Sequence, residues 1–255
     1  MKPPASTTIL GIETSCDETA AAVLDGEGHV LANVISSQQT VHERFGGVVP
    51  ELASRAHIQN VDHVTRQALD AAGLTWQDLG AIAVTQGPGL AGALLVGISY
   101  AKSLAYALGI PLVGVSHLEG HIASAWIDRP SFPRTCVVLI ASGGHTHLFH
   151  ATEHGGFHLM GRTIDDAAGE AFDKGAQMLG LGYPGGPLID AAARKGSPAA
   201  VRFPRSRVRT GQLDFSFSGL KTALLYHLQR MDQEAIVQQQ ADLAAGYQEA
   251  IVDVL

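Results

Sequence analysis

Short apolar strands alternate with helical segments through the first half of the chain, and this alternation restricts the fold more than any other feature. A turn at 25–28 separates the second strand from the third, so the first three strands form an antiparallel meander. Strands that alternate with helices predict an α/β layer architecture. The expected strands cover 7–13, 19–24, 29–36, 81–85 and 111–115, and the expected helices cover 50–72, 91–108 and a segment that begins at Ser116.

The uncharged run 79–100 is long enough to suggest a membrane span. It is interrupted by Thr-Gln-Gly-Pro-Gly at 85–89, and a turn inside hydrocarbon would leave backbone groups unpaired. We therefore interpret the run as a buried strand, a glycine turn and a helix, and we expect no membrane segment. No positively charged leader precedes the first apolar segment, so we expect no signal peptide.

The strand–turn–strand pattern returns after residue 131. Strands are expected at 136–141, 146–151 and 157–162, with Ser-Gly-Gly at 142–144 between the first two. We interpret this hairpin and the hairpin at the start of the chain as the same strand–turn–strand unit used twice. The alternative is a coincidence between two common hairpins. We therefore expect an α/β domain at 1–131 and a second at 132–255. Two such turns facing each other would line one cleft.

The remainder of the second half is expected to be helical, at 165–179, 220–230 and 234–255, with no clear fourth or fifth strand. The sequence ends inside an amphipathic helical run without a capping residue or a glycine stop. We expect the chain to be truncated at its C-terminus and the second domain to be incomplete.

Composition excludes several classes of protein. Two cysteines in 255 residues exclude a disulfide-built mini-fold and a four-cysteine zinc module. A net charge of −7 argues against a surface that coats nucleic acid by charge alone. Six of the 17 lysines and arginines nevertheless fall within 194–209, which contains no acid. This segment is either a phosphate contact or an exposed loop.

His117 and His121 lie four residues apart in Ser-His-Leu-Glu-Gly-His-Ile. On a helix this spacing places both imidazoles on one face, where they can bind one cation. The alternative is two ordinary surface histidines. A zinc peptidase would carry its glutamate directly after the first histidine, whereas Glu119 is two positions on. Ser116 and Glu119 also fit a capping box, which weakens the peptidase interpretation.

Two loops carry groups suited to chemistry. Between two apolar strands, 13–19 holds three acids and three hydroxyls. Asp17 and Glu18 are candidates for holding a water or a metal or for acid–base catalysis, against the alternative of a solvated loop. The glycines of 142–145 allow backbone N–H groups to approach an anion, although such a hairpin is often a plain turn.

The region 165–190 carries a further acidic pattern. Asp166, Glu170 and Asp173 would share one helix face, where like charges destabilise a helix unless a function or solvation offsets them. The loop at 182–187 is rigid and suited to passing beneath a flat ligand, with Asp190 on the next helical turn.

Eight ordered motifs resemble one known family, the tRNA threonylcarbamoyladenosine transferase subunit (TsaD family, formerly the O-sialoglycoprotein endopeptidase family). The resemblance runs from about residue 8 to the end. Eight motifs in order are far more specific than any one of them. They are GIETSCDET at 11–19, GGVVPELASRAH at 46–57, GPGLAGALLVG at 87–97, SHLEGHI at 116–122, ASGGHTHL at 141–148, DDAAGEAFDK at 165–174, GYPGG at 182–186 and FSFSGLKTA at 215–223.

The resemblance implies an actin/Hsp70/sugar-kinase (ASKHA) fold of two related α/β lobes. It implies transfer of the threonylcarbamoyl group from threonylcarbamoyl-adenylate to N6 of the adenosine next to the anticodon, in tRNAs reading codons that begin with A. The family's metal histidines, for iron or zinc, match His117 and His121. The matched substrate-binding positions are Ile140, Ala141, Ser142, Gly143, Gly144, Asp173, Gly186 and Asp190, and the matched acidic pair is Asp17 and Glu18.

The resemblance further implies tRNA as a partner, a small dimerising homologue, a P-loop ATPase subunit, a cytoplasmic location and no membrane. Whether ATP or ADP also binds stays open. The family continues beyond residue 255 with a glycine-rich nucleotide turn, an asparagine contact and a third metal ligand, an aspartate. The alternatives are a catalytically silent scaffold of the same superfamily, which would lack the paired histidines, a zinc peptidase, and a sugar or acetate kinase.

Overall fold

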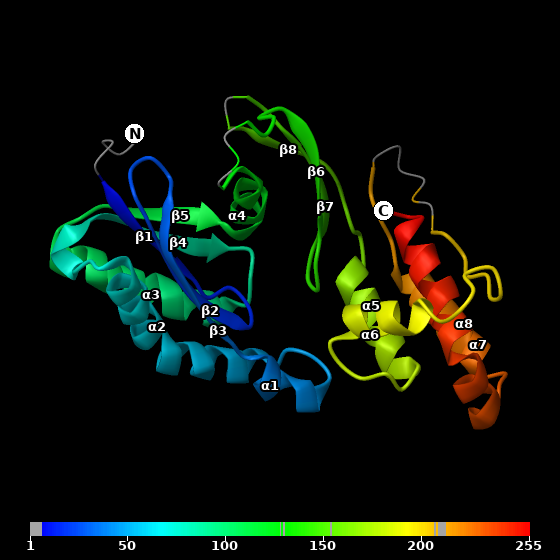
Figure 1. Cartoon of the computed structure of the whole chain (residues 1–255). Coiled ribbons are helices and arrows are strands. Elements are labelled where there is room, and N and C mark those ends of the chain that lie inside the picture. The colour runs from blue at the N-terminus through cyan, green and yellow to red at the C-terminus, as the bar shows by residue number, and fades with distance from the viewer. Residues whose placement is uncertain (1–6, 128, 130, 154, 207, 209–212) are drawn as a thin grey trace. The chain divides into compact units, whose positions relative to one another are not determined.

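The computed structural model describes residues 7–127, 129, 131–153, 155–206, 208 and 213–255. The chain divides into two compact units, Met1–Phe132 and Pro133–Leu255 (Figure 1). Each unit is an α/β arrangement and is described by itself.

Unit 1 contains a five-stranded sheet in the order β3-β2-β1-β4-β5. Strands β1, β2 and β3 pair antiparallel, which confirms the predicted meander, whereas β4 pairs parallel with both β1 and β5. The carboxyl ends of β1, β4 and β5 therefore lie at one edge. The strands are β1 (Thr8–Glu13), β2 (Glu18–Leu24), β3 (Val30–Ser37), β4 (Leu79–Gly87) and β5 (Leu112–Ser116).

The helices of unit 1 include the three predicted from the sequence and one short addition. They are α1 (Gln39–His42), α2 (Pro50–Ala72), α3 (Ala91–Leu108) and α4 (His117–Ala123), with 3₁₀ turns at Glu43–Phe45, Trp76–Asp78 and Ser124–Trp126. Helix α2 begins with proline in its first turn and ends at Gly73, which has a left-handed φ of 68°. Both residues are typical helix boundaries. The four-residue α1 was not predicted, because it is too short to show a period.

The core of unit 1 lies between the sheet and helices α2 and α3, which run along the same face in Figure 1. Alternate residues of β1 and β4 point into this layer, and α2 meets them with one apolar stripe. Strand periodicity of two and helix periodicity of 3.6 thus produce one shared core. Its fully or nearly fully buried members include Leu10, Ile12, Val23, Val61, Val64, Ala68, Ile82 and Val84.

Helix α3 is long and apolar enough to cross a membrane by length and composition. In unit 1 it packs through small residues, with Ala93, Gly97, Ala101 and Ala105 buried. A side chain at Gly97 would collide with Thr14, so a small residue is required at this approach. The interpretation of 79–100 as strand, turn and helix is confirmed.

Unit 2 begins with an antiparallel meander in the order β6-β7-β8, and among its described residues the sheet has these three strands. Four helices follow, and the sequence predicted α6 only as a helical turn at Asp190. The expected rigid loop at 182–187 is wrong in part, because the helix already begins at Gly185. The elements are β6 (Cys136–Ala141), β7 (Thr146–Ala151), β8 (Phe157–Arg162), α5 (Ala168–Met178), α6 (Gly185–Ala193), α7 (Ser218–Leu228) and α8 (Gln233–Val252).

Tyr247 of α8 is the largest fully buried side chain in the described part of the chain. Its hydroxyl donates a hydrogen bond of 3.0 Å to the carbonyl oxygen of Ala171 in α5. A Cβ on Gly175 would lie 2.5 Å from the tyrosine ring, so glycine allows α5 and α8 to approach each other. This contact organises the helical core of unit 2.

Asp165 joins the segment before α5 to the start of α7. Its carboxylate accepts hydrogen bonds from the hydroxyls of Ser216 (2.6 Å) and Ser218 (2.7 Å) and from the amide of Phe217 (2.8 Å). Burial opposes ionisation, but these hydrogen bonds outweigh it and lower the pKa of Asp165. Two sequence motifs 50 residues apart are thereby connected.

The predicted acidic helix face is wrong at one end. Helix α5 begins at Ala168, so Asp166 precedes it. The Asp166 carboxylate lies 3.1 Å from the ammonium groups of both Lys174 and Lys221, and Lys174 also pairs with Glu170 at 2.6 Å. Lysines therefore offset the like charges, which explains how the helix tolerates them.

Candidate functional site

Three polar residues meet at the carboxyl edge of the unit 1 sheet. Glu13 ends β1, Thr85 lies near the end of β4, and His117 directly follows β5. The Thr85 hydroxyl donates to Glu13 Oε2 at 2.7 Å, and His117 Nδ1 lies 3.1 Å from the same oxygen. In open α/β sheets this edge is where ligands bind.

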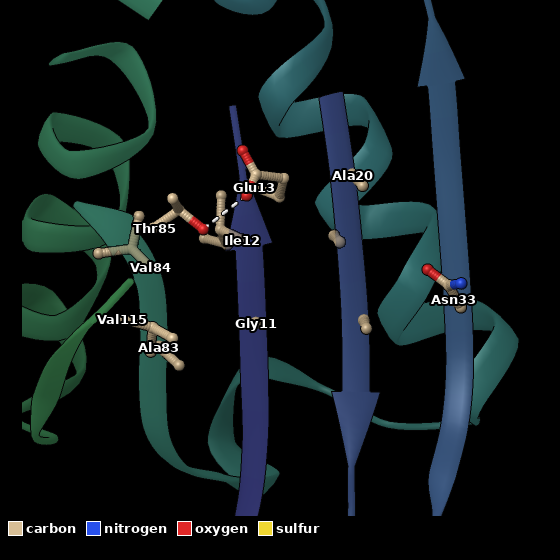
Figure 2. Close-up of a pocket in the computed structure, with 11 residues that line it drawn as sticks. Gly11, Ile12, Glu13, Ala20, Asn33, Ala83, Val84, Thr85 and Val115 are labelled. Atoms are coloured by element: carbon tan, nitrogen blue, oxygen red, sulfur yellow. Dashed lines mark hydrogen bonds between the residues drawn. The ribbon is translucent and has the colours of Figure 1, made fainter. Parts of the chain in front are cut away.

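A shallow cavity of about 290 Å³ lies over the sheet beside this edge. Figure 2 shows Glu13 and Thr85 joined across β1 and β4, with small residues of the strands around them. The cavity exists because short side chains leave the sheet surface low. The short residues of its lining are Gly11, Ala20, Ala21, Ala22 and Ala83.

His117 and His121, the histidine pair, point their Nε2 atoms toward each other from one face of α4. These nitrogens are 3.1 Å apart, and the ring centroids are 4.5 Å apart at an interplanar angle of 80°. Two imidazoles that bind one zinc ion at about 2.0–2.1 Å in tetrahedral geometry have their nitrogens about 3.3 Å apart. The geometry of the pair fits a shared cation.

The protonation state of His121 also suits a cation. Burial, followed by the proximity of His117, lowers the pKa of His121. Neutral imidazole is the form that binds metals, so His121 is in its ligand form at neutral pH. The donor set of nitrogen atoms suits zinc or iron.

Glu119 has a different function from that of a peptidase glutamate. Its backbone amide donates to the Ser116 hydroxyl at 3.4 Å, so Ser116 caps α4 as predicted. The Glu119 residue is exposed. This arrangement weakens the peptidase alternative further.

Glu13 was not among the residues selected from the sequence. Burial alone raises the pKa of Glu13, but hydrogen bonds from His117, Ser15 and Thr85 outweigh it and lower the pKa to about 2. The carboxylate is therefore ionised at neutral pH. In the sequence, Glu13 is only an acidic residue at the end of an apolar strand. The order of the strands in the sheet places it next to His117, 104 residues away.

Asp17 ends the turn that joins β1 to β2 (residues 14–17, the acidic turn), and Glu18 directly follows it. Asp17 is half-buried, and Glu18 is exposed as the first residue of β2. Two hydrogen bonds fix the backbone of the turn: Gln38 N donates to the Asp17 carbonyl at 3.0 Å, and His57 Nε2 donates to the Cys16 carbonyl at 3.0 Å. Burial lowers the pKa of His57, which keeps this donor neutral.

Cys16 does not add a nucleophile to the acidic turn. Burial, followed by the neighbouring Asp17 carboxylate, raises the pKa of its thiol to about 12. Nucleophilic attack needs the thiolate. The residue therefore serves the turn through its backbone.

The loop that precedes α3 packs directly on the acidic turn. The amide of Leu90 donates to the Ser15 carbonyl at 2.8 Å. A Cβ on Gly89 would lie 2.6 Å from that same oxygen, so only glycine fits. The start of the sequence motif at 87–97 thus supports the edge that carries Glu13.

In unit 2 the glycine turn (residues 142–145) is closed by a hydrogen bond of 2.8 Å from Ser142 N to the His145 carbonyl. Gly143 and Gly144 are exposed, with no described atom within 4 Å of the position that a Cβ would take. The backbone here is open to a ligand. Of the two residues before the turn, Ile140 is buried and Ala141 is exposed.

The start of α5 lies against the glycine turn. The Gly169 amide donates to the Ser142 carbonyl at 3.0 Å, and a Cβ on Gly169 would lie 2.6 Å from the Ser142 carbonyl carbon. Helix N-termini carry partial positive charge. The amides of Ala168 and Gly169 already donate, to the Thr146 hydroxyl at 2.8 Å and to the Ser142 carbonyl, so this helix end offers charge rather than free N–H groups. The arrangement suits an anionic group.

Asp173 lies against Gly185 at the start of α6, and Gly186 is the next residue of that helix. The Gly185 amide donates to Asp173 Oδ1 at 2.7 Å, so Asp173 satisfies a donor of that helix. Burial raises the pKa of Asp173, partly opposed by this hydrogen bond. Asp190 follows Gly186 by one turn, and its carboxylate accepts from Arg194 at 3.0 Å and from Gln248 at 3.3 Å.

Part of the basic segment 194–209 is neutralised within unit 2. Arg194 pairs with Asp190 at 2.7 Å, and Arg205 pairs with Asp253 at 2.6 Å. Arg207 and Arg209 lie outside the described residues. A contact of this segment with phosphate stays a prediction.

Solved structures show the fold. Component A of (R)-2-hydroxyglutaryl-CoA dehydratase from Acidaminococcus fermentans aligns with 97% of this chain and 76% of its own, with a TM-score of 0.51 and 15% identity. At that identity the likeness concerns the fold alone. The predicted actin/Hsp70/sugar-kinase fold class is confirmed.

Sequence comparison shows the family. The model of "TsaD: tRNA N6-adenosine threonylcarbamoyltransferase" matches residues 29–255. The enzyme of that name from Clostridium perfringens strain SM101 is 53% identical over 247 residues, which cover 97% of this chain and 73% of the relative. Its counterpart from Moorella thermoacetica is 54% identical over 249 residues, covering 98% and 73%. The chain therefore belongs to the tRNA N6-adenosine threonylcarbamoyltransferase family.

Proposed function

We propose that this chain transfers the threonylcarbamoyl group from threonylcarbamoyl-adenylate to N6 of the adenosine next to the anticodon, in tRNAs that read codons beginning with A. The observation that carries the proposal is identity of 53% over 97% of the chain to a transferase of that name. The open glycine turn and the converging histidine pair support it with suitable chemistry.

The histidine pair would hold one divalent ion, iron or zinc. When bound, such an ion supplies a Lewis acid that polarises a carbonyl or neutralises a departing phosphate. The chain's own contribution is to present two nitrogens 3.1 Å apart from a single helix face. Because the mixed anhydride of the substrate is already activated, no protein nucleophile is required, and the raised pKa of Cys16 is consistent with that.

The backbone of the glycine turn would hold the phosphate of the adenylate, with the positive end of the α5 helix dipole beside it. Backbone N–H groups that do not reorganise during reaction stabilise charge where it develops. The backbone of Ile140 and Ala141 leads into this turn, while Asp173, Gly186 and Asp190 would contact the nucleoside. Positioning of the two reactants would supply much of the rate.

Asp17 or Glu18 would accept the proton from the exocyclic amine of adenine, a poor nucleophile. The support from the structure is a turn held by Gln38 and His57, which places these carboxylates on a fixed backbone. In the Asp17→Asn variant we expect a lower rate of single-turnover transfer. An undiminished rate would remove Asp17 from this role.

The natural partners would be tRNA, a small dimerising homologue and a P-loop ATPase, with a separate enzyme making the adenylate, all in the cytoplasm. The basic segment 194–209 is the candidate contact for tRNA phosphates, in a chain whose overall charge is −7.

The decisive experiment is a transfer assay with purified tRNA, synthetic threonylcarbamoyl-adenylate and the partner proteins, combined with metal analysis. We expect one divalent ion per chain and modified adenosine in tRNA, both lost in His117→Ala. The Glu119→Gln variant is the matched control, because it removes an exposed carboxylate from the same helix. Transfer that survives His117→Ala would contradict the metal role, and peptide cleavage lost in that variant would revive the peptidase alternative.

A further inference from the structure

The side chain of Glu13 is surrounded by donors. Its Oε2 accepts from the Thr85 hydroxyl at 2.7 Å, and its Oε1 accepts from the Ser15 amide. The third neighbour is Nδ1 of His117, 3.1 Å from Oε2. The Thr85 hydroxyl and the Ser15 amide therefore anchor the carboxylate at the end of a strand in addition to the histidine.

This arrangement determines where the His117 proton lies. An ionised carboxylate accepts hydrogen bonds and donates none, so Nδ1 must carry the hydrogen. The Ser15 hydroxyl, 3.2 Å from Nδ1, can share that N–H as a second acceptor. A neutral imidazole has one N–H, which leaves the lone pair on Nε2. Nε2 is the atom that faces Nε2 of His121 at 3.1 Å.

We infer that Glu13 is a positioning residue, which holds His117 in the Nδ1–H tautomer so that its Nε2 lone pair is directed at the cation shared with His121. The inference rests on the proposed metal role of the histidine pair. Carboxylates that accept the second ring N–H of a metal-binding histidine orient the ring and raise its basicity, and their loss costs about 10–100-fold in metal affinity.

Sheet order explains why Glu13 can do this and other acids cannot. The ends of β1 and β5 flank the end of β4, so Glu13 and His117 converge although 104 residues separate them. Glu119 is nearer to His117 in sequence, but its side chain is exposed and its backbone amide donates to the capping hydroxyl of Ser116. The position of Glu13 at the end of β1, and not its charge alone, therefore makes it the partner of His117.

The test compares Glu13→Gln with Glu119→Gln in the full chain, since each removes one negative charge. Zinc affinity is measured by competition with a chromogenic chelator, with His117→Ala as the reference for loss of the site. The tautomer of His117 is measured in the metal-free protein by long-range ¹H–¹⁵N correlation. We expect Glu13→Gln to weaken zinc binding about 10–100-fold and to populate the Nε2–H tautomer, and Glu119→Gln to change neither.

The outcomes separate this inference from the function on which it rests. Zinc affinity that is unaffected by His117→Ala overturns the metal role and the inference together. Affinity that depends on His117 but is equal in Glu13→Gln and wild type, with the tautomer unchanged, overturns the inference alone. If Glu13→Gln does not fold by circular dichroism, Thr85→Val removes a donor that orients the same carboxylate. Zinc binding unchanged in that variant would then refute the inference, and a several-fold loss would support it.

Discussion

Replacing Gly169 with alanine tests whether the start of α5 and the glycine turn form one unit. The new Cβ would lie 2.6 Å from the Ser142 carbonyl carbon and 2.7 Å from the Gly143 Cα. Non-bonded carbons pack at about 3.5–4.0 Å, so helix and turn must separate by about 1 Å. Both neighbours are backbone atoms, which have no rotamer to change.

The expected cost follows from three contributions. Overpacking of this size costs about 1–3 kcal/mol, and stretching the 3.0 Å hydrogen bond from Gly169 N to Ser142 O costs about 1 kcal/mol. Alanine regains up to about 1 kcal/mol over glycine within a helix. We expect a net destabilisation of about 1–3 kcal/mol. A displacement of about 1 Å in a group that holds a substrate can cost about 10²-fold in rate.

Urea unfolding would measure the stability of Gly169→Ala, and isothermal titration with a non-hydrolysable adenylate analogue would measure binding. Gly219→Ala is the matched control, because a Cβ there meets only the Ser206 hydroxyl at 3.4 Å in the same unit. Because Gly219 lies in helix α7, we expect the control to be as stable as wild type or up to about 1 kcal/mol more stable, and to bind the analogue with wild-type affinity. Equal stability and equal analogue affinity in Gly169→Ala and Gly219→Ala would refute the reasoning.

Three further predictions concern stability, each measured by urea unfolding. Asp165→Asn should destabilise unit 2 by about 2 kcal/mol. Because the pKa of Asp165 is lowered in the folded state, the stability of wild type should decrease as the pH falls below about 4, and the decrease should be smaller in the variant. His57→Ala should reduce stability by about 3 kcal/mol, because it removes a buried ring and its hydrogen bond to the Cys16 carbonyl. The pKa of His57 is lowered in the folded state, so the stability of wild type should decrease as the pH falls below about 6.5. Gly175→Ala should cost about 1–3 kcal/mol by displacing the Tyr247 ring, more than the roughly 1 kcal/mol for Tyr247→Phe, which loses one hydrogen bond. A cost for Gly175→Ala below that of Tyr247→Phe would contradict the third expectation, and wild-type stability independent of pH between 4 and 7 would contradict the second. An equal loss of stability below pH 4 in wild type and Asp165→Asn would contradict the first.

Strong local patterns made most elements predictable. The strands at the start of each unit and the long helices α2 and α3 appear where periodicity and glycine or proline boundaries placed them. The start of helix α6 was missed because its first residues, Gly-Gly-Pro, are typical of a loop. Asp173 from another helix accepts a hydrogen bond from the Gly185 amide and so stabilises this start. Asp166 was assigned to a helix that begins two residues later. Both errors concern the residue at which a helix begins.

The sequence by itself determined the α/β class, the family and the helical spacing that brings His117 and His121 together, because these depend on residues within a few turns or on motifs in order. Only the tertiary structure decided that Glu13 contacts His117 and that Thr85 contacts Glu13. These contacts form because the parallel pairing of β1, β4 and β5 places the ends of the three strands at one edge of the sheet. It also decided that Gly169 abuts the glycine turn. Such neighbours result from sheet order and helix packing, and no local pattern of residues records them.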